Sequence, residues 1–497
     1  MRHSLETILS QARALLFAAA LFGLGRPAMV AQSPTASQPW AYLLLHDSTL
    51  LDDCPVCDRL SVPVPMRGTF NVRLIEETPI SARYALEDVN FTAGDRPYLV
   101  RGGGTYEISG EIAVTVRMSL ELQIDDGVTN KLCYFTNSAS GVDRRLPMLD
   151  ITVVQTNGTL TQVYTLRLAA APVREIWFST ASAFKAAAGP EAPKVVEGGD
   201  FISASGRIIK RNADLFTSVG AFPPAPDLGL DAMDILPGGE VAFSLASDIT
   251  SNTLGPLQHG DLLSTRGRIL RRNQDLLAMF GLQPPAPDVG LDAVHFGDNG
   301  EILFSIQTNI FSERLGVTLH RGDLLSTNGT VVRTCEQLLA RFHPAKAAND
   351  YGLDALYIWP SGEMWFSTED AFDDVVFGPI SSGDLLSDQG YIVFRNPELL
   401  NAFAPTNTPS EIGLDALYVV TDAILPAPAP RLAIQVNAST ASAELAWQGQ
   451  GRVFQIERAS DLTGPFQPLS PILPGLTFDN PGTLTNSAQS YYRLRQW

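Results

Sequence analysis

The sequence predicts an all-β protein, and three observations lead to this fold class. Short runs in the first third of the chain alternate apolar and polar residues and are rich in β-branched side chains, a pattern typical of strands with one buried face. A unit of about 61 residues then occurs four times, and each copy contains three or four short apolar runs. The last part of the chain again consists of alternating apolar runs, as expected for a small β-sandwich.

The first 31 residues have the three-part layout of a secretion signal. Two arginines precede an apolar run at residues 14–25, and the small residues Ala28 and Ala31 follow it. The run is shorter than the roughly 20 residues that a membrane-spanning helix needs. We therefore expect an exported protein at an extracellular, cell-surface or periplasmic location, with no membrane span after removal of the signal. An uncleaved anchor is the alternative.

Composition and charge narrow the class of partner. Hydrophobic residues make up 45% of the chain and charged residues 18%, as in a folded protein, and the net charge is -18. Binding to nucleic acid draws its free energy from lysine and arginine, so this charge argues against a nucleic-acid partner. The same charge argues against docking on an anionic membrane surface.

Residues 40–171 are predicted to form a β-sandwich or barrel domain. Four segments carry the clearest alternation, at 69–75, 111–118, 149–154 and 162–168. An Asn-Gly pair at Asn157 and Gly158 separates the last two segments, and this pair favours a tight turn between antiparallel strands.

Two motifs mark the repeat in the second half of the chain. The motif G-L-D-A begins at Gly229, Gly290, Gly352 and Gly413, at steps of 61, 62 and 61 residues. A second motif, G-D-[LF]-[LI]-S, keeps the same period with its aspartates at Asp200, Asp261, Asp323 and Asp384. A period of this size indicates one supersecondary unit copied in tandem.

The repeats at residues 174–422 are predicted to close into a four-bladed β-propeller. Strands that are apolar on both faces, such as Val241–Leu245 and Leu353–Ile358, must be covered on both sides, and neighbouring blades provide that cover. The block opens with E-I-W-F-S and closes with G-L-D-A-L-Y-V-V. If the last strand joins the first blade, four complete units result. An open solenoid is the alternative, but we find no polar caps for it.

The repeat unit loosely resembles the hemopexin-type repeat. The resemblance rests on an Asp-Ala pair at a strand start, at 231–232, 292–293, 354–355 and 415–416, with the aromatic residues Phe243, Phe304 and Phe366 downstream. It implies a four-bladed propeller. The unit is also similar to the GLDA-type repeats of exported bacterial proteins that carry no assigned activity.

A proline-rich linker at residues 423–430 precedes a last module at 431–497. Proline-rich segments of this kind hold an extended, semi-rigid shape. Trp447 lies on an early predicted strand, and the chain ends with the tyrosine-bearing run Y-Y-R-L-R. The module resembles a fibronectin type III domain, which implies a small β-sandwich that binds or presents rather than catalyses.

The aspartates of the G-L-D-A motif are the candidate metal ligands. If these strands are the innermost of each blade, one carboxylate per blade converges on the axis, from Asp231, Asp292, Asp354 and Asp415. Such an arrangement suits calcium, which takes six to eight oxygen ligands. The alternative is that each aspartate caps a turn by accepting backbone N–H groups where its strand begins.

Three of the four cysteines are disulfide candidates. Cys54, Cys57 and Cys133 lie in the predicted N-terminal domain, whereas Cys335 lies far away in the repeats. Export implies an oxidising compartment, which favours a structural disulfide over a redox or zinc site. The pairing cannot be deduced from the sequence.

Recognised catalytic motifs are absent from the sequence. We therefore predict an exported, non-enzymatic binding or scaffolding protein whose ligand is a protein or a glycan. The predicted binding face consists of the variable loops after E-x-x-F-S, such as 308–319 and 369–380. A secreted hydrolase or lyase acting on polysaccharide is the alternative, as is a structural component of the cell surface.

Overall fold

The protein is essentially all-β, as predicted. A computed structural model describes residues 38–497, except 59, 96–97, 111–113, 139, 142–145, 222–226, 284–286, 298, 347–349, 409–411, 425–426, 438–441 and 481–489. Strands make up about 48% of the structure and helices about 5%, which confirms the fold class. The predicted secretion signal lies outside the described residues. None of the described helices is both long and apolar enough to cross a membrane.

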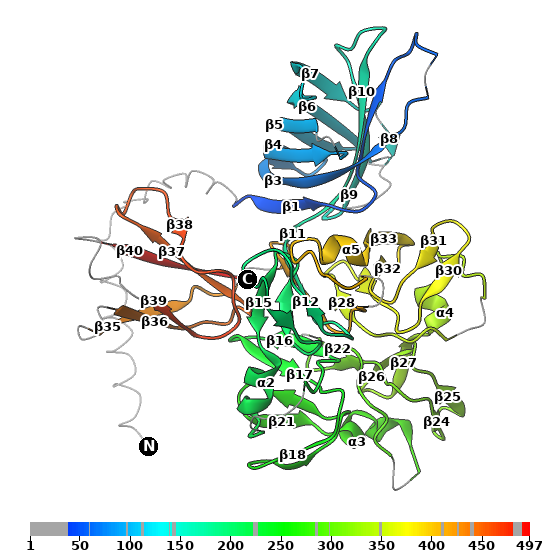
Figure 1. Ribbon diagram of the computed structural model, residues 1–497, viewed down its shortest axis with the longest axis vertical. Coiled ribbons are helices and arrows are strands. Elements are labelled where there is room, and N and C mark those ends of the chain that lie inside the picture. Colours follow the sequence, from blue (N-terminus) through cyan, green and yellow to red (C-terminus); the bar gives the residue numbers. More distant parts are fainter. Residues whose placement is uncertain are drawn as a thin grey trace, which may run out of the picture. The chain divides into compact units, whose positions relative to one another are not determined.

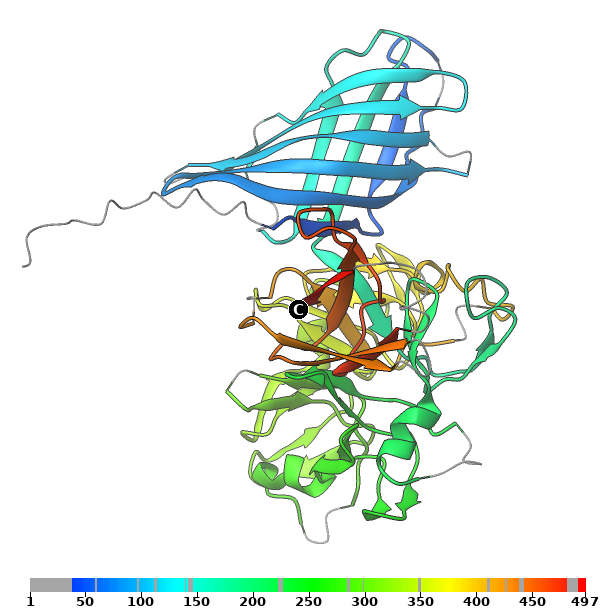
Figure 2. The same cartoon turned by 90° about the vertical axis from the view of Figure 1, so that its left-hand side faces the viewer.

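Ten strands form one sheet that closes into a barrel (Figures 1 and 2). The strands are β1 (Trp40–Leu44), β2 (Thr49–Asp53), β3 (Val64–Thr78), β4 (Ser81–Ala93), β5 (Tyr98–Ser109), β6 (Thr115–Asp125), β7 (Asn130–Thr136), β8 (Ser140–Gly141), β9 (Leu149–Gln155) and β10 (Val163–Ala171). Closure follows because β10 pairs with β1 and β2 on one side and with β9 on the other. Alternate residues of β6 are buried, which fills the barrel with side chains.

The cysteines behave only partly as predicted. Cys54 and Cys57 form a disulfide in the loop after β2, with Cα atoms 5.2 Å apart. Cys133, which we had included among the disulfide candidates, is not bonded. Its side chain is fully buried in the barrel core on β7, and Cys335, the other free cysteine, lies in the repeats.

The repeats form four sheets of four strands each, which we name the four-sheet ring. The strand orders are β15-β14-β11-β34, β16-β17-β20-β21, β22-β23-β26-β27 and β28-β29-β32-β33. The bounds of the first sheet are β11 Val173–Phe178, β14 Phe201–Ser203, β15 Arg207–Lys210 and β34 Leu417–Thr421. Those of the second are β16 Met233–Leu236, β17 Glu240–Phe243, β20 Leu262–Ser264 and β21 Arg268–Arg271. Those of the third are β22 Val294–Phe296, β23 Ile302–Phe304, β26 Leu324–Ser326 and β27 Thr330–Arg333, and those of the fourth are β28 Leu356–Ile358, β29 Met364–Phe366, β32 Leu385–Ser387 and β33 Tyr391–Phe394.

Each repeat also carries a short hairpin and a helical turn. The hairpins are β12 (Phe184–Lys185) with β13 (Val195–Val196), β18 (Ile249–Ser251) with β19 (Gly255–Leu257), β24 (Ile310–Ser312) with β25 (Val317–Leu319), and β30 (Phe372–Asp374) with β31 (Gly378–Ile380). The helices are α2 (Asn212–Ser218), α3 (Asn273–Leu276) with the 3-10 turn η1 (Ala278–Phe280), α4 (Cys335–Leu338) and α5 (Asn396–Leu399).

The first and last strands of the repeats pair with each other. The late strand β34 lies antiparallel beside β11, so that Phe178 faces Leu417 across the pair. The innermost strands also contact one another in cyclic order, β34 with β16, β16 with β22, β22 with β28 and β28 with β34. This pairing leaves neither terminal strand of the four-sheet ring with an open edge at its junction.

One serine in each repeat joins neighbouring sheets. The serine that ends E-x-x-F-S donates a hydrogen bond to the leucine carbonyl of the G-L-D-A motif in the next sheet. The four bonds are Ser179 to Leu230 (2.6 Å), Ser244 to Leu291 (3.0 Å), Ser305 to Leu353 (2.8 Å) and Ser367 to Leu414 (2.8 Å). All four serines are fully buried, so each bond also satisfies a hydroxyl that water cannot reach. The two sequence motifs are thus the two halves of one contact between sheets.

The aspartates of G-D-[LF]-[LI]-S organise turns. Asp200 accepts the backbone N–H of Asn212 at 2.9 Å and that of Glu197 at 3.2 Å. The same two bonds recur at Asp261, Asp323 and Asp384. Each aspartate therefore fixes the start of a helical turn in its repeat.

The C-terminal module consists of two three-stranded sheets, and it packs against the four-sheet ring. Its strands are β35 (Arg431–Asn437), β36 (Ser442–Gln448), β37 (Phe454–Ala459), β38 (Gln467–Pro468), β39 (Thr477–Asn480) and β40 (Tyr491–Gln496). The Gly451 carbonyl accepts the backbone N–H of Gly238 at 2.8 Å, and the indole N–H of Trp497 donates to Asp422 at 2.8 Å. These contacts place Arg452 against the inner strand β16.

Candidate functional site

One position of the innermost strands breaks the repeat. Two residues after the alanine of G-L-D-A, the four strands carry Asp234, His295, Tyr357 and Tyr418. All four residues line a single cavity of about 470 Å³, which we name the axial cavity. Its remaining wall consists of Phe296, Gly297, Ile358, Trp359, Pro360, Ala423, Ile424 and Arg452. The volume lies in the range of about 300–1,000 Å³ that small-molecule sites occupy.

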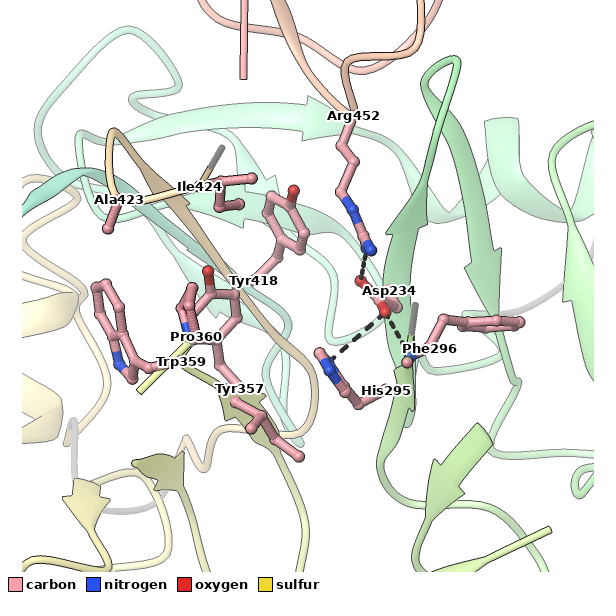
Figure 3. Close-up of a pocket in the computed structure, with 12 residues that line it drawn as sticks. Asp234, His295, Phe296, Tyr357, Trp359, Pro360, Tyr418, Ala423, Ile424 and Arg452 are labelled. Atoms are coloured by element: carbon pink, nitrogen blue, oxygen red, sulfur yellow. Dashed lines mark hydrogen bonds and ion pairs between the residues drawn. The ribbon is translucent and has the colours of Figure 1, made fainter. Parts of the chain in front are cut away.

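Aromatic side chains form one side of the axial cavity (Figure 3). The ring of Tyr357 meets Tyr418 edge to face at 6.1 Å and meets Trp359 at 5.3 Å. Trp359 packs in turn on Trp365 at 4.8 Å. Edge-to-face contacts of this kind hold aromatic rings in defined orientations, so this wall is rigid before any ligand arrives.

Charged and polar groups form the opposite side, and Asp234 is their centre (Figure 3). One carboxylate oxygen of Asp234 accepts the backbone N–H of Ile235 at 2.7 Å and lies 3.2 Å from the guanidinium of Arg452. The other accepts the backbone N–H of Phe296 at 2.8 Å and lies 3.8 Å from Nδ1 of His295. Both oxygens of the carboxylate are therefore occupied by contacts within the protein, and these contacts hold Ile235, Phe296 and Arg452 in place.

Arg452 is the only residue of the C-terminal module in the described lining of the axial cavity. Besides Asp234, its guanidinium donates to the Ile235 carbonyl at 2.7 Å. Its side chain is 20% exposed and that of Asp234 is 6% exposed. A charge pair this well buried must be mutually neutralised to be tolerated, so the cavity wall carries little net charge from this pair.

The two phenol groups remain available for a ligand. Tyr357 is 6% exposed and Tyr418 is 2% exposed, and neither hydroxyl has a hydrogen-bond partner among the described residues. The buried indole N–H of Trp359 also lacks a partner within the described part of the chain. Burial raises the pKa of both phenols far above the usual value, so at neutral pH each is an uncharged O–H that can donate and accept.

The predicted metal ligands lie two residues before the inner strands begin, and three residues before the cavity position. We name Asp231, Asp292, Asp354 and Asp415 the aspartate ring. At about 3.3 Å per residue of extended chain, the two levels are separated by at most about 10 Å along the chain. The inner strands that follow these aspartates contact one another in cyclic order.

Burial dominates the electrostatics of the aspartate ring. It raises the pKa of Asp231 to about 7, although the amide of Gln307 donates to this carboxylate at 2.6 Å. Burial and then repulsion from the other members of the ring raise the pKa values of Asp292, Asp354 and Asp415 well above the usual value. One buried oxygen of Asp292 has no hydrogen-bond partner among the described residues.

The aspartate ring does not form a ready-made ligand set for calcium. Within the described residues, no group of three or more His, Cys, Asp or Glu side chains is arranged to hold a metal ion. The axial calcium site therefore stays a prediction of the sequence.

The alternative role as turn caps belongs to a different set of aspartates. The carboxylates of Asp227, Asp288 and Asp350 accept the backbone N–H of the first glycine of G-L-D-A, at 3.2, 2.9 and 3.1 Å. The G-L-D-A aspartates accept no such bond among the described residues. In an Asx turn, the side chain accepts the backbone N–H group two residues later. The aspartate that caps the G-L-D-A glycine therefore lies two residues before that glycine, which is four residues before the aspartate that the sequence interpretation proposed as the cap.

The variable loops that we predicted as the binding face are mostly ordered hairpins. Residues 308–319 form β24–β25 and residues 369–380 form β30–β31. They follow the phenylalanine end of strands such as β17, whereas the axial cavity lies at the opposite end, where Leu236 pairs with Glu240. Aligning the four repeats would have exposed the cavity position, since Asp, His, Tyr and Tyr stand there in one column.

Comparisons with known proteins do not assign the chain to a family. No family model matches it, and no curated protein matches it. Among solved structures, it is similar to the extracellular domain of a proposed one-component system from B. thetaiotaomicron, at 8% identity and a TM-score of 0.18. That similarity covers 92% of this chain and 96% of the other, and its low score carries no argument about fold or function.

Proposed function

We propose that this protein is an exported, non-enzymatic binding protein, that its four-sheet ring is a four-bladed propeller, and that the axial cavity is its ligand site. The observation that carries the proposal is the loss of repetition at one position. Neighbouring positions of the inner strands keep the repeat because they pack between sheets. The cavity position instead carries four polar or aromatic side chains of three different types.

Binding is favoured over hydrolysis by the chemistry of the cavity wall. Hydrolysis of a glycosidic bond by the usual mechanism needs two carboxyl groups about 5–9.5 Å apart. The described wall contains one carboxylate, Asp234, and this group already accepts two backbone N–H bonds and pairs with Arg452. A group held in this way is suited to support neighbouring side chains rather than to transfer a proton.

The proposal is tested by blocking the cavity. Wild-type protein and an Ala423→Phe variant are compared by thermal shift and ligand-observed NMR against amino acids, polyamines, dicarboxylates and monosaccharides. Ala433→Phe is the matched control, because Ala433 is exposed on β35 and is not part of the cavity wall. We expect at least one compound class to bind the wild type and the control but not the blocked variant.

Two results would contradict this function. In the first, every compound that binds does so equally well to the blocked variant, or none binds at all. In the second, the wild-type protein releases new reducing ends from a polysaccharide and the Asp234→Asn variant does not, which would identify a hydrolase.

A further inference from the structure

We propose that the axial cavity takes an uncharged, polyhydroxylated ligand, such as a neutral sugar unit at the end of a glycan. The inference rests on the proposed function and adds the chemical class of the ligand. It follows from three properties of the cavity wall: its charge, its unpaired hydroxyls and its aromatic surfaces.

The charge of the wall disfavours a cationic ligand. A buried ammonium or guanidinium group gains most from a carboxylate that is free to pair with it. Asp234 is the one carboxylate in the described wall. Its two oxygens already accept hydrogen bonds from the backbone N–H groups of Ile235 and Phe296 and from the guanidinium of Arg452. A cationic ligand would have to displace Arg452, which is also bonded to the Ile235 carbonyl.

An anionic ligand is disfavoured for the complementary reason. The guanidinium of Arg452 lies 3.2 Å from the carboxylate of Asp234, which largely neutralises its positive charge within the wall. The whole chain carries a net charge of -18, which repels anions at long range. Within the wall, neither a cation nor an anion finds an unpaired counter-charge, so a neutral ligand gives up less hydration free energy on entering than an ion does.

The unpaired hydroxyls point to a ligand that both donates and accepts hydrogen bonds. The phenol groups of Tyr357 and Tyr418 line the axial cavity and lack hydrogen-bond partners among the described residues. Each phenol can donate one bond and accept others. A sugar hydroxyl has the same dual capacity, so one ligand can satisfy both groups.

The aromatic rings suit the other surface of a sugar. The C–H groups on one side of a pyranose ring form an apolar face that packs against an aromatic ring. Tyr357, Tyr418 and Trp359 offer such surfaces in one rigid wall, opposite the polar groups of Asp234, His295 and Arg452 (Figure 3). An amphipathic ring between these two sides would meet apolar atoms on one side and hydrogen-bonding groups on the other.

The test is a titration of the full protein with matched neutral and charged sugars. The neutral probes are the methyl glycosides of glucose, galactose and mannose, and N-acetylglucosamine. Glucosamine supplies a cationic analogue, glucuronate an anionic one, and arginine a guanidinium. Binding is followed by calorimetry and by tryptophan fluorescence.

We expect at least one neutral probe to bind, and its charged analogue to bind at least tenfold more weakly. A Tyr357→Phe/Tyr418→Phe double variant should weaken binding of the neutral probe at least tenfold while leaving the melting temperature of the free protein unchanged. Tyr106→Phe is the matched control, because Tyr106 is buried in the barrel core, away from the cavity, and this variant should bind like the wild type.

The inference is overturned if no neutral probe binds, or if one binds equally well to the double variant. Binding of glucosamine, glucuronate or arginine alone, abolished by Ala423→Phe, would overturn the neutral-sugar inference while leaving the proposed binding function intact. Failure of every compound class to bind at the cavity would overturn both.

Discussion

The aspartate ring directly precedes the four inner strands that line the axial cavity, yet the ring and the cavity differ in almost every chemical respect. The aspartate ring repeats one residue four times, so like charges gather in a buried place and their pKa values rise. Three residues further along, the cavity position carries an acid, a histidine and two tyrosines, and the acid is neutralised by Arg452. Repetition builds the frame, whereas a site that distinguishes one ligand from another needs non-equivalent groups around it.

The largest effect in this comparison should come from breaking the charge pair of the cavity. Asp234→Ala removes the carboxylate that neutralises the partly buried Arg452 and that accepts the N–H groups of Ile235 and Phe296. We expect a loss of about 3 kcal/mol in the free energy of unfolding, measured with urea. Glu87→Ala removes a more exposed partner of Arg73 on the barrel and should cost less than about 1 kcal/mol. Similar losses in both variants would show that the buried pair of Asp234 and Arg452 contributes no more to stability than an exposed ion pair does.

The aspartate ring should respond in the opposite direction. Asp292→Asn removes a buried carboxylate that is repelled by its neighbours and has one oxygen without a hydrogen-bond partner in the described part of the chain. We expect this variant to be more stable than the wild type by about 1 kcal/mol at pH 8, with EDTA leaving the melting temperatures of both unchanged. If instead calcium raises the melting temperature of the wild type and the substitution abolishes this rise, the predicted axial calcium site is real.

The pH dependence of the melting temperature should distinguish the aspartate ring from the axial cavity. The folded-state pKa of Asp231 is about 7, above the ordinary value of 3.8, so the folded protein holds this proton more tightly than the unfolded chain does. The stability that this proton contributes is fully present below about pH 4 and is lost as the pH rises to about 7. The melting temperature should therefore fall across this window, and the fall should be smaller in Asp231→Asn. An equal fall in that variant would assign the effect to other groups.

The smallest effect should come from the cavity tyrosines. In the free protein, Tyr357→Phe and Tyr418→Phe remove hydroxyls without partners among the described residues, so each should change the free energy of unfolding by less than about 0.5 kcal/mol. Tyr391→Phe, in another part of the four-sheet ring, is the matched contrast, because the Tyr391 hydroxyl donates a hydrogen bond to buried Glu363. Loss of this hydroxyl should lower the free energy of unfolding by about 1.5–3 kcal/mol. Equal costs would mean that the cavity hydroxyls are already paired.

Much of the framework could be predicted from local patterns. Period-two alternation placed the barrel strands, as in β6, because a strand with one buried face must alternate. The 61-residue period and the unmatched motifs at its two ends anticipated the pairing of β34 with β11. The same period identified the aspartates of G-D-[LF]-[LI]-S as equivalent, and all four accept the same two backbone N–H groups.

The candidate site could not be predicted in the same way. Asp234, His295, Tyr357 and Tyr418 each stand two residues after a G-L-D-A motif, but their side chains are of three types, so the motif marks the position and not its chemistry. Arg452 comes from a different module altogether and reaches Asp234 only because the module packs on the inner strands. Cys133 was counted among the disulfide candidates because nothing in its sequence context shows that its side chain is enclosed in the barrel.

Hydrophobic periodicity and repetition are local properties of the chain, and they were sufficient for the all-β class and for the sets of equivalent residues. The side chains that surround each set of equivalent residues are decided by contacts between residues far apart in the chain. Burial raised the pKa values of the repeated aspartates, and packing of the C-terminal module neutralised Asp234 with Arg452. Local pattern therefore specifies the strands, whereas the electrostatic environment that makes a site arises only when distant segments exclude water from the same place.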